Sequence, residues 1–395
     1  MNLLRMRITF KMPKKYDLFI HIAVIALMVF GSLMITSTSV GETFISKNVV
    51  MKTFIKQLIF MIAGYLGMVF LANNFTMSRA KWWSQPVGYL IVAMLVVCLL
   101  FEETGGARSW IHIPIPFLGD MTLQPSEFFK TFMVILMAVT VESTRRKNYD
   151  WWSIIKLPFI FFLVGAGLVF YQNDAGSVIV LAIICSICFM IPSHPNLKGV
   201  QRVVGSLIAV AGIGVVFILT PMGVSTMEKS SFLQSHQLSR ITIAADPFVD
   251  PYGDGFQLIN SLYAFSTGGW NGLGLGQSIQ KMAYLPEAKT DYILPITVEE
   301  LGISGFVFIL VFYSIIIYRL FYYSLKTKSE GYRILFIGTA LYLFVHFVFN
   351  VGGVSGLLPL MGIPLLFISS GASSLLSICC ALGVCQATIS KMNAE

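Results

Sequence analysis

Apolar residues recur in ten segments, each long enough, or nearly long enough, to span a lipid bilayer as a helix. Short polar loops separate most of them. We place the segments at 17–37, 53–73, 84–101, 125–141, 153–172, 174–191, 201–221, 297–321, 333–353 and 362–387. The fifth and sixth are nearly continuous, so a tight hairpin is expected around Asn173 and Asp174. An even number of spans puts both termini on one side of the membrane.

The composition agrees with a membrane protein. Hydrophobic residues make up 56% of the 395 residues and charged residues 12%, about half the charged share of soluble domains. The basic start leads into an apolar run, Leu18 to Ile35, without a small-residue cleavage site, which predicts an uncleaved first helix. The prediction is an all-α polytopic fold in one integral membrane domain, 1–395. It has cytoplasmic tails at 1–16 and 388–395 and a large extracytoplasmic loop, 222–296, between helices 7 and 8.

Basic residues indicate the orientation. Lys and Arg gather in the N-terminal tail and in the loops after even-numbered segments, as in Arg145, Arg146 and Lys147. The short loops on the other face hold Lys47, Lys52 and Arg108. The positive-inside rule therefore predicts that both termini are cytoplasmic. The same placement explains the net charge of +8 better than nucleic-acid binding does.

The cysteines and histidines predict no metal or disulfide chemistry. All six cysteines lie inside apolar runs, so Cys185 and Cys188, although spaced as CxxC, are expected to be small packing residues. The five histidines show no HExxH spacing, so no zinc site is assigned.

One polar stretch, residues 282–302, stands directly before an apolar helix. It holds five ionisable side chains: Glu287, Lys289, Asp291, Glu299 and Glu300. Ionisable groups at a membrane boundary are costly to desolvate and often functional. Pro286 and Pro295 limit regular helix there. The alternative is a solvated loop followed by a helix start.

Several motifs, taken in order, resemble one family. They are TLQPSEFFK from Thr122, SRITIAADPFVDPYGDGFQ, GLGLGQS, YLPEAKTDYI, EELG, and NVGGVSGLLPLMGIPLLFISSGASSL from Asn350. Together they resemble the SEDS family of bacterial cell-wall proteins, the FtsW/RodA/SpoVE group, over nearly the whole chain. The resemblance implies a glycosyltransferase that polymerises lipid II, the undecaprenyl-pyrophosphate-linked precursor of peptidoglycan, during cell division or elongation. The implied partners are a class B penicillin-binding protein and other divisome or elongasome membrane proteins.

The resemblance also assigns residues. The essential aspartate of the TD(F/Y)I motif falls on Asp291, and the tryptophan of the first large loop falls on Trp110, beside Arg108. The QPSE segment supplies Gln124, Ser126, Glu127 and Lys130.

Two family segments depart from the usual pattern. Asn173 replaces a proline before Asp174, and Ser370 and Ala372 replace a tyrosine and a glycine before Ser373 and Ser374. Asp174 and the serines are kept, and the serines are retained as expected substrate contacts.

Glycosyl transfer needs a base for the acceptor hydroxyl and positive charge for the leaving pyrophosphate. Asp291 can be the base if burial and Glu287 raise its pKa. Arg108, Lys281 and Lys289 are the expected pyrophosphate contacts, with solvent exposure or structural ion pairs as the alternatives. A divalent cation, magnesium or manganese, would suit phosphate substrates, yet the sequence shows no dedicated ligand set.

Other polar groups carry two interpretations each. Glu127 and Lys130, at i and i+3, can pair on one face of the fourth helix, and a buried structural pair is favoured over a functional one. Trp110 either stacks on a sugar or lies in the interfacial aromatic belt. The glycine-rich run 350–364 either re-enters the membrane and packs beneath 282–302 as a wall of the substrate cavity, or forms an external turn.

Two other functions fit a polytopic chain with Glu127, Asp174 and Asp291 at membrane level. A flippase would move a charged lipid, but the acidic cluster lies on an outer loop and no inverted repeats are evident. A non-catalytic scaffold would only recruit the transpeptidase.

Overall fold

The computed structural model describes most of the chain. The described residues are 8–42, 48–104, 106–115, 119–144, 150–218, 220, 222–223, 235–282, 285 and 287–394.

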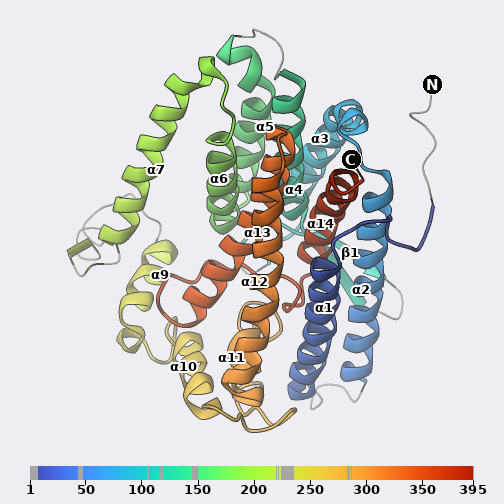
Figure 1. Cartoon of the computed structure of the whole chain (residues 1–395). Helices are drawn as coiled ribbons and strands as arrows, with labels where there is room; N and C mark the ends of the chain where they lie inside the picture. The colour runs from blue at the N-terminus through green and yellow to red at the C-terminus, as the bar shows by residue number, and fades with distance from the viewer. Residues whose placement is uncertain are drawn as a thin grey trace.

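In the described part of the chain, ten helices of 15 or more residues lie at the ten predicted positions and make up the body of the protein (Figure 1). They are α1 (Leu18–Thr38), α2 (Val49–Asn74), α3 (Met77–Cys98), α4 (Pro125–Thr144), α5 (Trp151–Tyr171), α6 (Ala175–Phe189), α7 (Lys198–Ile218), α12 (Ile303–Lys326), α13 (Glu330–Val354) and α14 (Ala372–Met392). Among the described residues, eight helices are long and apolar enough to cross a membrane. The other two are α4, with three charged side chains, and the 15-residue α6. The polytopic all-α prediction is confirmed, and the count of ten spans stays a prediction.

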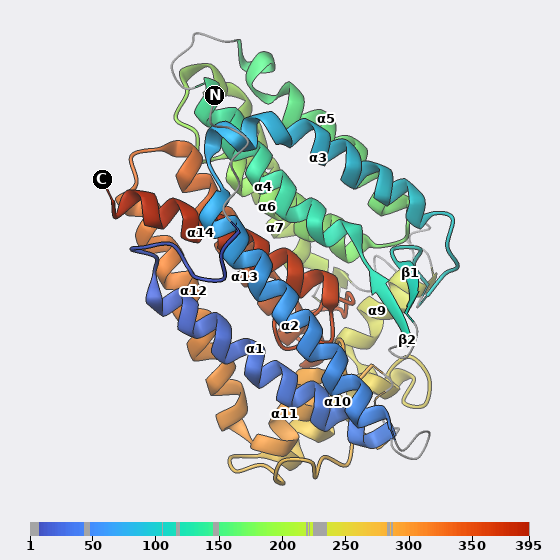
Figure 2. The ribbon, with the colours of Figure 1, turned by 90° about the vertical axis from the view of Figure 1, so that its right-hand side faces the viewer.

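The helices pack around α4, α13 and α14. Helix α14 contacts α2, α4 and α13, while α13 also contacts α12 and α6. Figure 2 shows α1 along one side of the bundle and α3 with α5 along the other, with α13 and α14 between them. Helix α7 leans away from this body (Figure 1), and none of its described side chains is buried.

The first and last helices meet at one end of the bundle. The side-chain amide of Gln386, on α14, bonds both the N–H and the C=O of Asp17, which caps α1. Ser390 donates to the Lys14 carbonyl over 2.6 Å. Helices α10 and α11 lie at the opposite end (Figure 1). Residues 14–17 and 386–390 therefore lie at the end of the bundle opposite to α11.

The loop 102–124 contains a β-hairpin that the all-α prediction missed. Strand β1 (Ile111–Ile115) pairs antiparallel with β2 (Gly119–Leu123), with Ile111 opposite Leu123. Isoleucines alternate with other residues in IHIPI, which suits a strand with one covered face.

The predicted loop 222–296 is largely helical where it is described. It contains α9 (Ser235–Ala245), the 3₁₀ turn η3 (Pro247–Val249), α10 (Phe256–Gly268) and the start of α11 (Ile293–Leu301). Two further 3₁₀ turns, η1 (Ser39–Glu42) and η2 (Pro195–Leu197), follow α1 and precede α7.

Two predicted helix boundaries were wrong. The segment 297–321 is split at Gly302, whose φ of +66° and close approach to the Trp270 carbonyl require glycine. The segment 362–387 becomes helical only at Ala372. Residues 355–371 instead form an irregular stretch, the bridging segment, in which Leu365 to Ser369 are buried.

Candidate functional site

Asp291 lies in the turn that leads into α11, at the end of the bundle away from the termini. Ala288 and Tyr292 on either side are buried, and the Tyr292 N–H donates to the Glu287 carbonyl over 3.1 Å. The Asp291 carbonyl accepts a hydrogen bond of 2.9 Å from the amide of Asn350, on α13. Helix α13 thus holds the backbone of the turn, while Asp291 stays partly exposed.

The surroundings of Asp291 raise its pKa to about 7. Burial is the largest cause, and the negative charge of Glu287 adds to it, as the sequence predicts. The Arg240 guanidinium, on α9, acts in the opposite direction, and the carboxylate of Asp174 raises the pKa further. Segments far apart in the sequence therefore act on one carboxyl group.

Glu287 and Lys289 lie at the surface of the same turn. The Glu287 carboxylate accepts a 2.7 Å hydrogen bond from the Thr290 hydroxyl. Lys289 Nζ lies 2.5 Å from a carboxylate oxygen of Glu42, with the two side chains 20% and 45% exposed. Lys289 is thus a partly solvated cation beside Asp291.

Lys281, Glu299 and Glu300 are inside the protein. Lys281 Nζ lies 2.6 Å from Glu300 Oε1, and both side chains are fully buried. Glu299 accepts hydrogen bonds from the Ser278 hydroxyl and from two backbone N–H groups, of Ile279 at 3.2 Å and Gln280 at 3.3 Å. These residues attach the loop before the turn to α11, and the Lys281 ammonium faces a structural partner.

The bridging segment packs against the Asp291 turn, as in the first of the two interpretations of the glycine-rich run, and its role as a cavity wall stays a prediction. The Ser369 hydroxyl donates to the Thr290 carbonyl over 2.7 Å, and the Ser370 N–H to the Lys289 carbonyl over 2.8 Å. A Cβ added to Gly362, at φ +66°, would lie 3.5 Å from a carboxylate oxygen of Asp291. The irregular backbone begins later than predicted, because Gly352 and Gly353 lie within α13.

Asp174, Gln124 and Ser373 form a second polar group at this end. Asp174 caps α6 by accepting from the Ser177 N–H, and its other oxygen accepts from the Gln124 amide, both over 3.0 Å. The Ser373 hydroxyl accepts from the Gln124 N–H over 2.8 Å, and Ser374 donates to the Gly371 carbonyl. The predicted hairpin between α5 and α6 is present, with Asn173 at φ +62°.

Arg108 and Trp110 lie just before β1. Arg108 pairs with Glu103 over 3.1 Å, and both side chains are about half exposed, at 51% and 48%. Its backbone N–H donates to the Gln172 carbonyl over 2.9 Å, which attaches the loop beside Asp174. Trp110 is partly buried.

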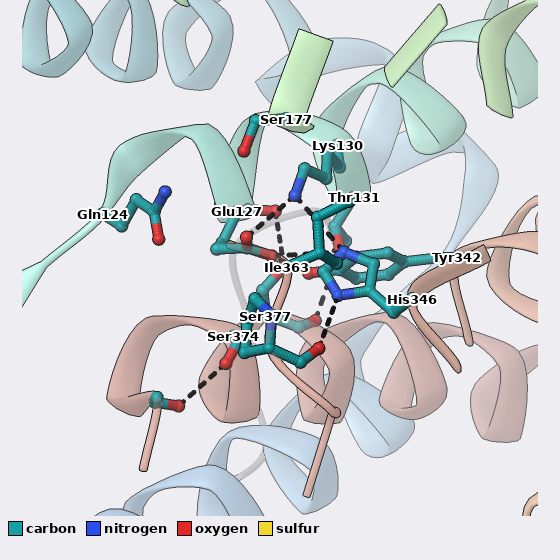
Figure 3. Close-up of polar contacts among 12 residues, drawn as sticks. Gln124, Glu127, Lys130, Thr131, Ser177, Tyr342, His346, Ile363, Ser374 and Ser377 are labelled. Carbon is teal, nitrogen blue, oxygen red and sulfur yellow. Dashed lines mark hydrogen bonds and ion pairs between the residues drawn. The ribbon is translucent and has the colours of Figure 1, made fainter. Parts of the chain in front are cut away.

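Glu127 and Lys130 form the buried pair expected of them, with Lys130 Nζ 2.8 Å from Glu127 Oε1 (Figure 3). The other Glu127 oxygen accepts from the Tyr342 hydroxyl over 2.5 Å. His346 Nε2 lies 3.3 Å from Lys130 Nζ, and the Ser377 hydroxyl donates to the Glu127 carbonyl over 2.8 Å. The pair connects α4 to α13 and α14.

The comparisons place this architecture in a family. Residues 17–394 match the family model of the FtsW, RodA and SpoVE cell cycle proteins. The chain belongs to this family. A relative from Bacillus subtilis (strain 168), "Probable peptidoglycan glycosyltransferase FtsW", is 33% identical over 381 residues, covering 95% of this chain and 90% of its own. One of the same name from Trichlorobacter lovleyi is 32% identical over 384 residues, covering 94% and 92%.

Solved structures of the family share the fold. A chain from "Structural coordination of polymerization and crosslinking by a peptidoglycan synthase complex" aligns with a TM-score of 0.69 at 22% identity, covering 97% of this chain and all of that one. The Rod shape determining protein RodA of Thermus thermophilus aligns at 0.62 and 19% identity, covering 95% and 97%. At these identities the likeness establishes the fold alone.

Two residues to which the motifs assigned no role act on or contact Asp291. Arg240 lies inside the SRITIAADP motif, so the motif itself could have indicated that Arg240 lies near Asp291. Asn350 begins the glycine-rich motif, four residues after His346. As for metals, the described residues contain no group of three His, Cys, Asp or Glu side chains that could hold an ion.

Proposed function

We propose that this protein is a peptidoglycan glycosyltransferase that polymerises lipid II, with Asp291 as the general base. The observation that carries the proposal is a partly exposed carboxyl group whose pKa is raised to about 7, in a chain whose curated relatives are named for this activity. A base with a pKa near the working pH is efficient, because it is largely ionised and still takes up a proton readily.

The reaction is a single displacement. Asp291 accepts the proton of the acceptor sugar hydroxyl while that oxygen attacks the anomeric carbon of the donor. The bond from this carbon to the pyrophosphate oxygen breaks, and undecaprenyl pyrophosphate leaves with the bonding electrons. By analogy with glycoside hydrolases, one base and no carboxylate nucleophile imply inversion.

The leaving pyrophosphate needs cations, and the basic side chains of the site differ in exposure and in ion pairing. Arg240 is exposed, and its charge already acts on Asp291, so we assign it the first contact. Lys289 and Arg108 are held in partly exposed ion pairs that a pyrophosphate could replace. Lys281 is the weakest of the predicted contacts, because its ammonium is paired in the interior. No step is assigned to a metal ion, since the described residues supply no ligand set.

The protein is multi-pass, and we propose that it lies in the bacterial plasma membrane with both termini cytoplasmic and Asp291 outside. The positive-inside rule supports this orientation. Cysteine at the exposed position Glu287 should react with an impermeant thiol reagent in intact cells, and cysteine at the exposed position Lys328 should not. The reverse pattern would refute the orientation.

A class B penicillin-binding protein is the proposed partner, working with other divisome or elongasome membrane proteins. The support is that one structural neighbour comes from a peptidoglycan synthase complex that couples polymerisation to crosslinking.

The decisive experiment uses purified protein, its partner and lipid II in detergent. Without a membrane barrier, a polymerase makes glycan strands, whereas a flippase or a scaffold makes none. Asp291→Ala in the same mixture tests whether any polymer comes from a contaminating enzyme. No polymer from wild-type protein that is folded and bound to its partner would reject the proposed activity.

A further inference from the structure

The bridging segment poses a hydrogen-bonding problem. It is irregular backbone that is buried at Ile363 and from Leu365 to Ser369, and Pro364 between them has no N–H. Buried carbonyls need partners, and irregular backbone at membrane depth is tolerated only inside protein or beside water. Two adjacent carbonyls, those of Ile363 and Pro364, therefore depend on side chains from elsewhere.

Helix α13 supplies both partners from one face. His346 and Asn350 are four residues apart, so their side chains point the same way. The Asn350 amide donates to the Ile363 carbonyl over 3.0 Å and to the Asp291 carbonyl over 2.9 Å. One buried amide thus joins the bridging segment to the Asp291 turn.

His346 connects the same segment to the ion pair on α4. Its Nδ1 lies 3.0 Å from the Pro364 carbonyl, which can only accept, so Nδ1 carries the proton. In the neutral ring Nε2 is then an acceptor, and it faces Lys130 Nζ at 3.3 Å (Figure 3). Lys130 in turn donates to Glu127 over 2.8 Å.

We infer that Asn350 is a positioning residue for Asp291: its amide ties the Asp291 turn directly to the bridging segment, which His346 and the Glu127–Lys130 pair hold from the other side. The chain of contacts runs from the ion pair through His346 and the Pro364 and Ile363 carbonyls to Asn350 and the Asp291 backbone. This chain of contacts fixes the position of the Asp291 carboxyl group relative to Gly362, which lies next to it. A purely structural Asn350 would stabilise the fold without affecting how Asp291 titrates.

The inference rests on the proposed function only for its catalytic readout. The charged groups that act on Asp291 are Glu287 of its own turn, Arg240 of α9 and Asp174 of the α5–α6 turn, and Tyr292 is the titratable side chain next to it. Helix α13 and the bridging segment face it with Asn350 and Gly362, which carry no charge. A change at Asn350 can therefore alter the titration of Asp291 only by moving the turn.

The test compares Asn350→Leu with Gln386→Leu in the full-length protein. Both substitutions replace a buried amide with two backbone contacts by an apolar side chain of similar size, but Gln386 lies at the other end of the bundle. Two quantities are measured: the pH dependence of polymerisation, and the pH dependence of carbodiimide labelling of Asp291, read by peptide mass spectrometry. Labelling reports the protonated carboxyl group whether or not the protein is a polymerase.

For Asn350→Leu we expect kcat to fall about 10- to 100-fold, because small misplacements of a catalytic group are costly. The acidic limb of the pH–rate profile and the midpoint of labelling should both move to lower pH by on the order of one unit. A looser turn is better hydrated, and hydration stabilises the ionised carboxylate. Gln386→Leu should leave both midpoints in place. If Asn350→Leu does not fold, Asn350→Ser, which keeps one donor, should give a smaller shift in the same direction.

The histidine gives a second arm. His346→Asn can retain the donor to Pro364 and should keep the wild-type midpoint, whereas His346→Leu should shift it. Wild-type midpoints in folded Asn350 variants, or equal shifts in the Gln386 control, would overturn the inference. If the wild-type protein makes no polymer but the Asn350 variants shift the labelling midpoint of Asp291, the polymerase activity is rejected and the positioning role is kept.

Discussion

Lys281 and Glu300 form an ion pair with no exposure to solvent, in which Nζ and Oε1 are 2.6 Å apart. The pair is completed from α1, because Lys281 Nζ also donates to the Ser37 carbonyl and the Ser37 hydroxyl donates to Glu300. Three elements, α1, the loop before the Asp291 turn and α11, are joined at this point. Each charge is acceptable there only because the other is present.

Removing one member of this pair should destabilise the protein strongly. Lys281→Met leaves a buried carboxylate without its cation, and we expect a loss of about 3–5 kcal/mol. The double variant Lys281→Met, Glu300→Leu removes both charges and should recover most of that loss. Thermal unfolding in detergent measures both effects, and equal instability in the two variants would contradict the expectation.

Asp291→Asn should abolish polymerisation, with a loss of at least about 100-fold expected for a general base. It should also change how stability depends on pH. The folded state binds the Asp291 proton more tightly than the unfolded state, in which the pKa of the side chain is near 3.8. The free energy of unfolding therefore falls as pH rises from 3.8 to about 7, and it stays lowered at higher pH. Asparagine avoids this cost.

We therefore expect Asp291→Asn to melt at a higher temperature than wild type at pH 8.5, with a smaller difference at pH 5. Wild-type polymerisation should rise as pH increases through about 7. Polymer yield near wild type at matched protein level would refute the assignment of the base.

Lys289 and Glu42 allow a matched test of pyrophosphate binding. Their pair is partly exposed, so breaking it should cost no more than about 1 kcal/mol. If Lys289 contacts the substrate, Lys289→Met raises KM for lipid II, whereas Glu42→Gln frees the ammonium and leaves KM unchanged or lower. Steady-state kinetics separates the two, and parallel increases in KM would show that the pair only supports the turn.

Gly362 and Gly356 give a second matched pair. Both have positive φ, at +66° and +76°, so alanine at either position costs roughly 1–2 kcal/mol. An added methyl at Gly362 lies against the Asp291 carboxylate, whereas one at Gly356 lies against Leu258 of α10. We expect Gly362→Ala to lower kcat about 10-fold beyond the Gly356→Ala effect, through displacement of the carboxyl group. Equal kcat values in the two variants would argue against the contact.

The sequence predicts the membrane helices well because lipid imposes a simple rule. A span must bury its own backbone polarity in helix and cover it with apolar side chains. The β-hairpin, α9 and α10 escaped prediction because they lie outside the ten apolar segments. The break at Gly302 is also invisible in hydropathy, since the residues on both sides are apolar.

The site was predictable only as far as neighbours in the sequence reach. Asp291 follows from its motif, and the effect of Glu287 from a spacing of four residues. The amide of Asn350 reaches Asp291 across 59 residues, and Lys289 meets Glu42 across 247. Such partners depend on helix packing, which a single sequence does not specify. Arg240 acts on Asp291 from α9 for the same reason.

The carboxylate of Glu299 accepts hydrogen bonds from Ser278, Ile279 and Gln280, which attaches the preceding loop to α11. On its other side α11 ends at Gly302, where the chain bends before α12. The loop and α11 are therefore joined into one unit, and Asp291 lies two residues before Ile293, the first residue of α11. Any movement of that loop would therefore be shared by α11 and by the turn that carries Asp291.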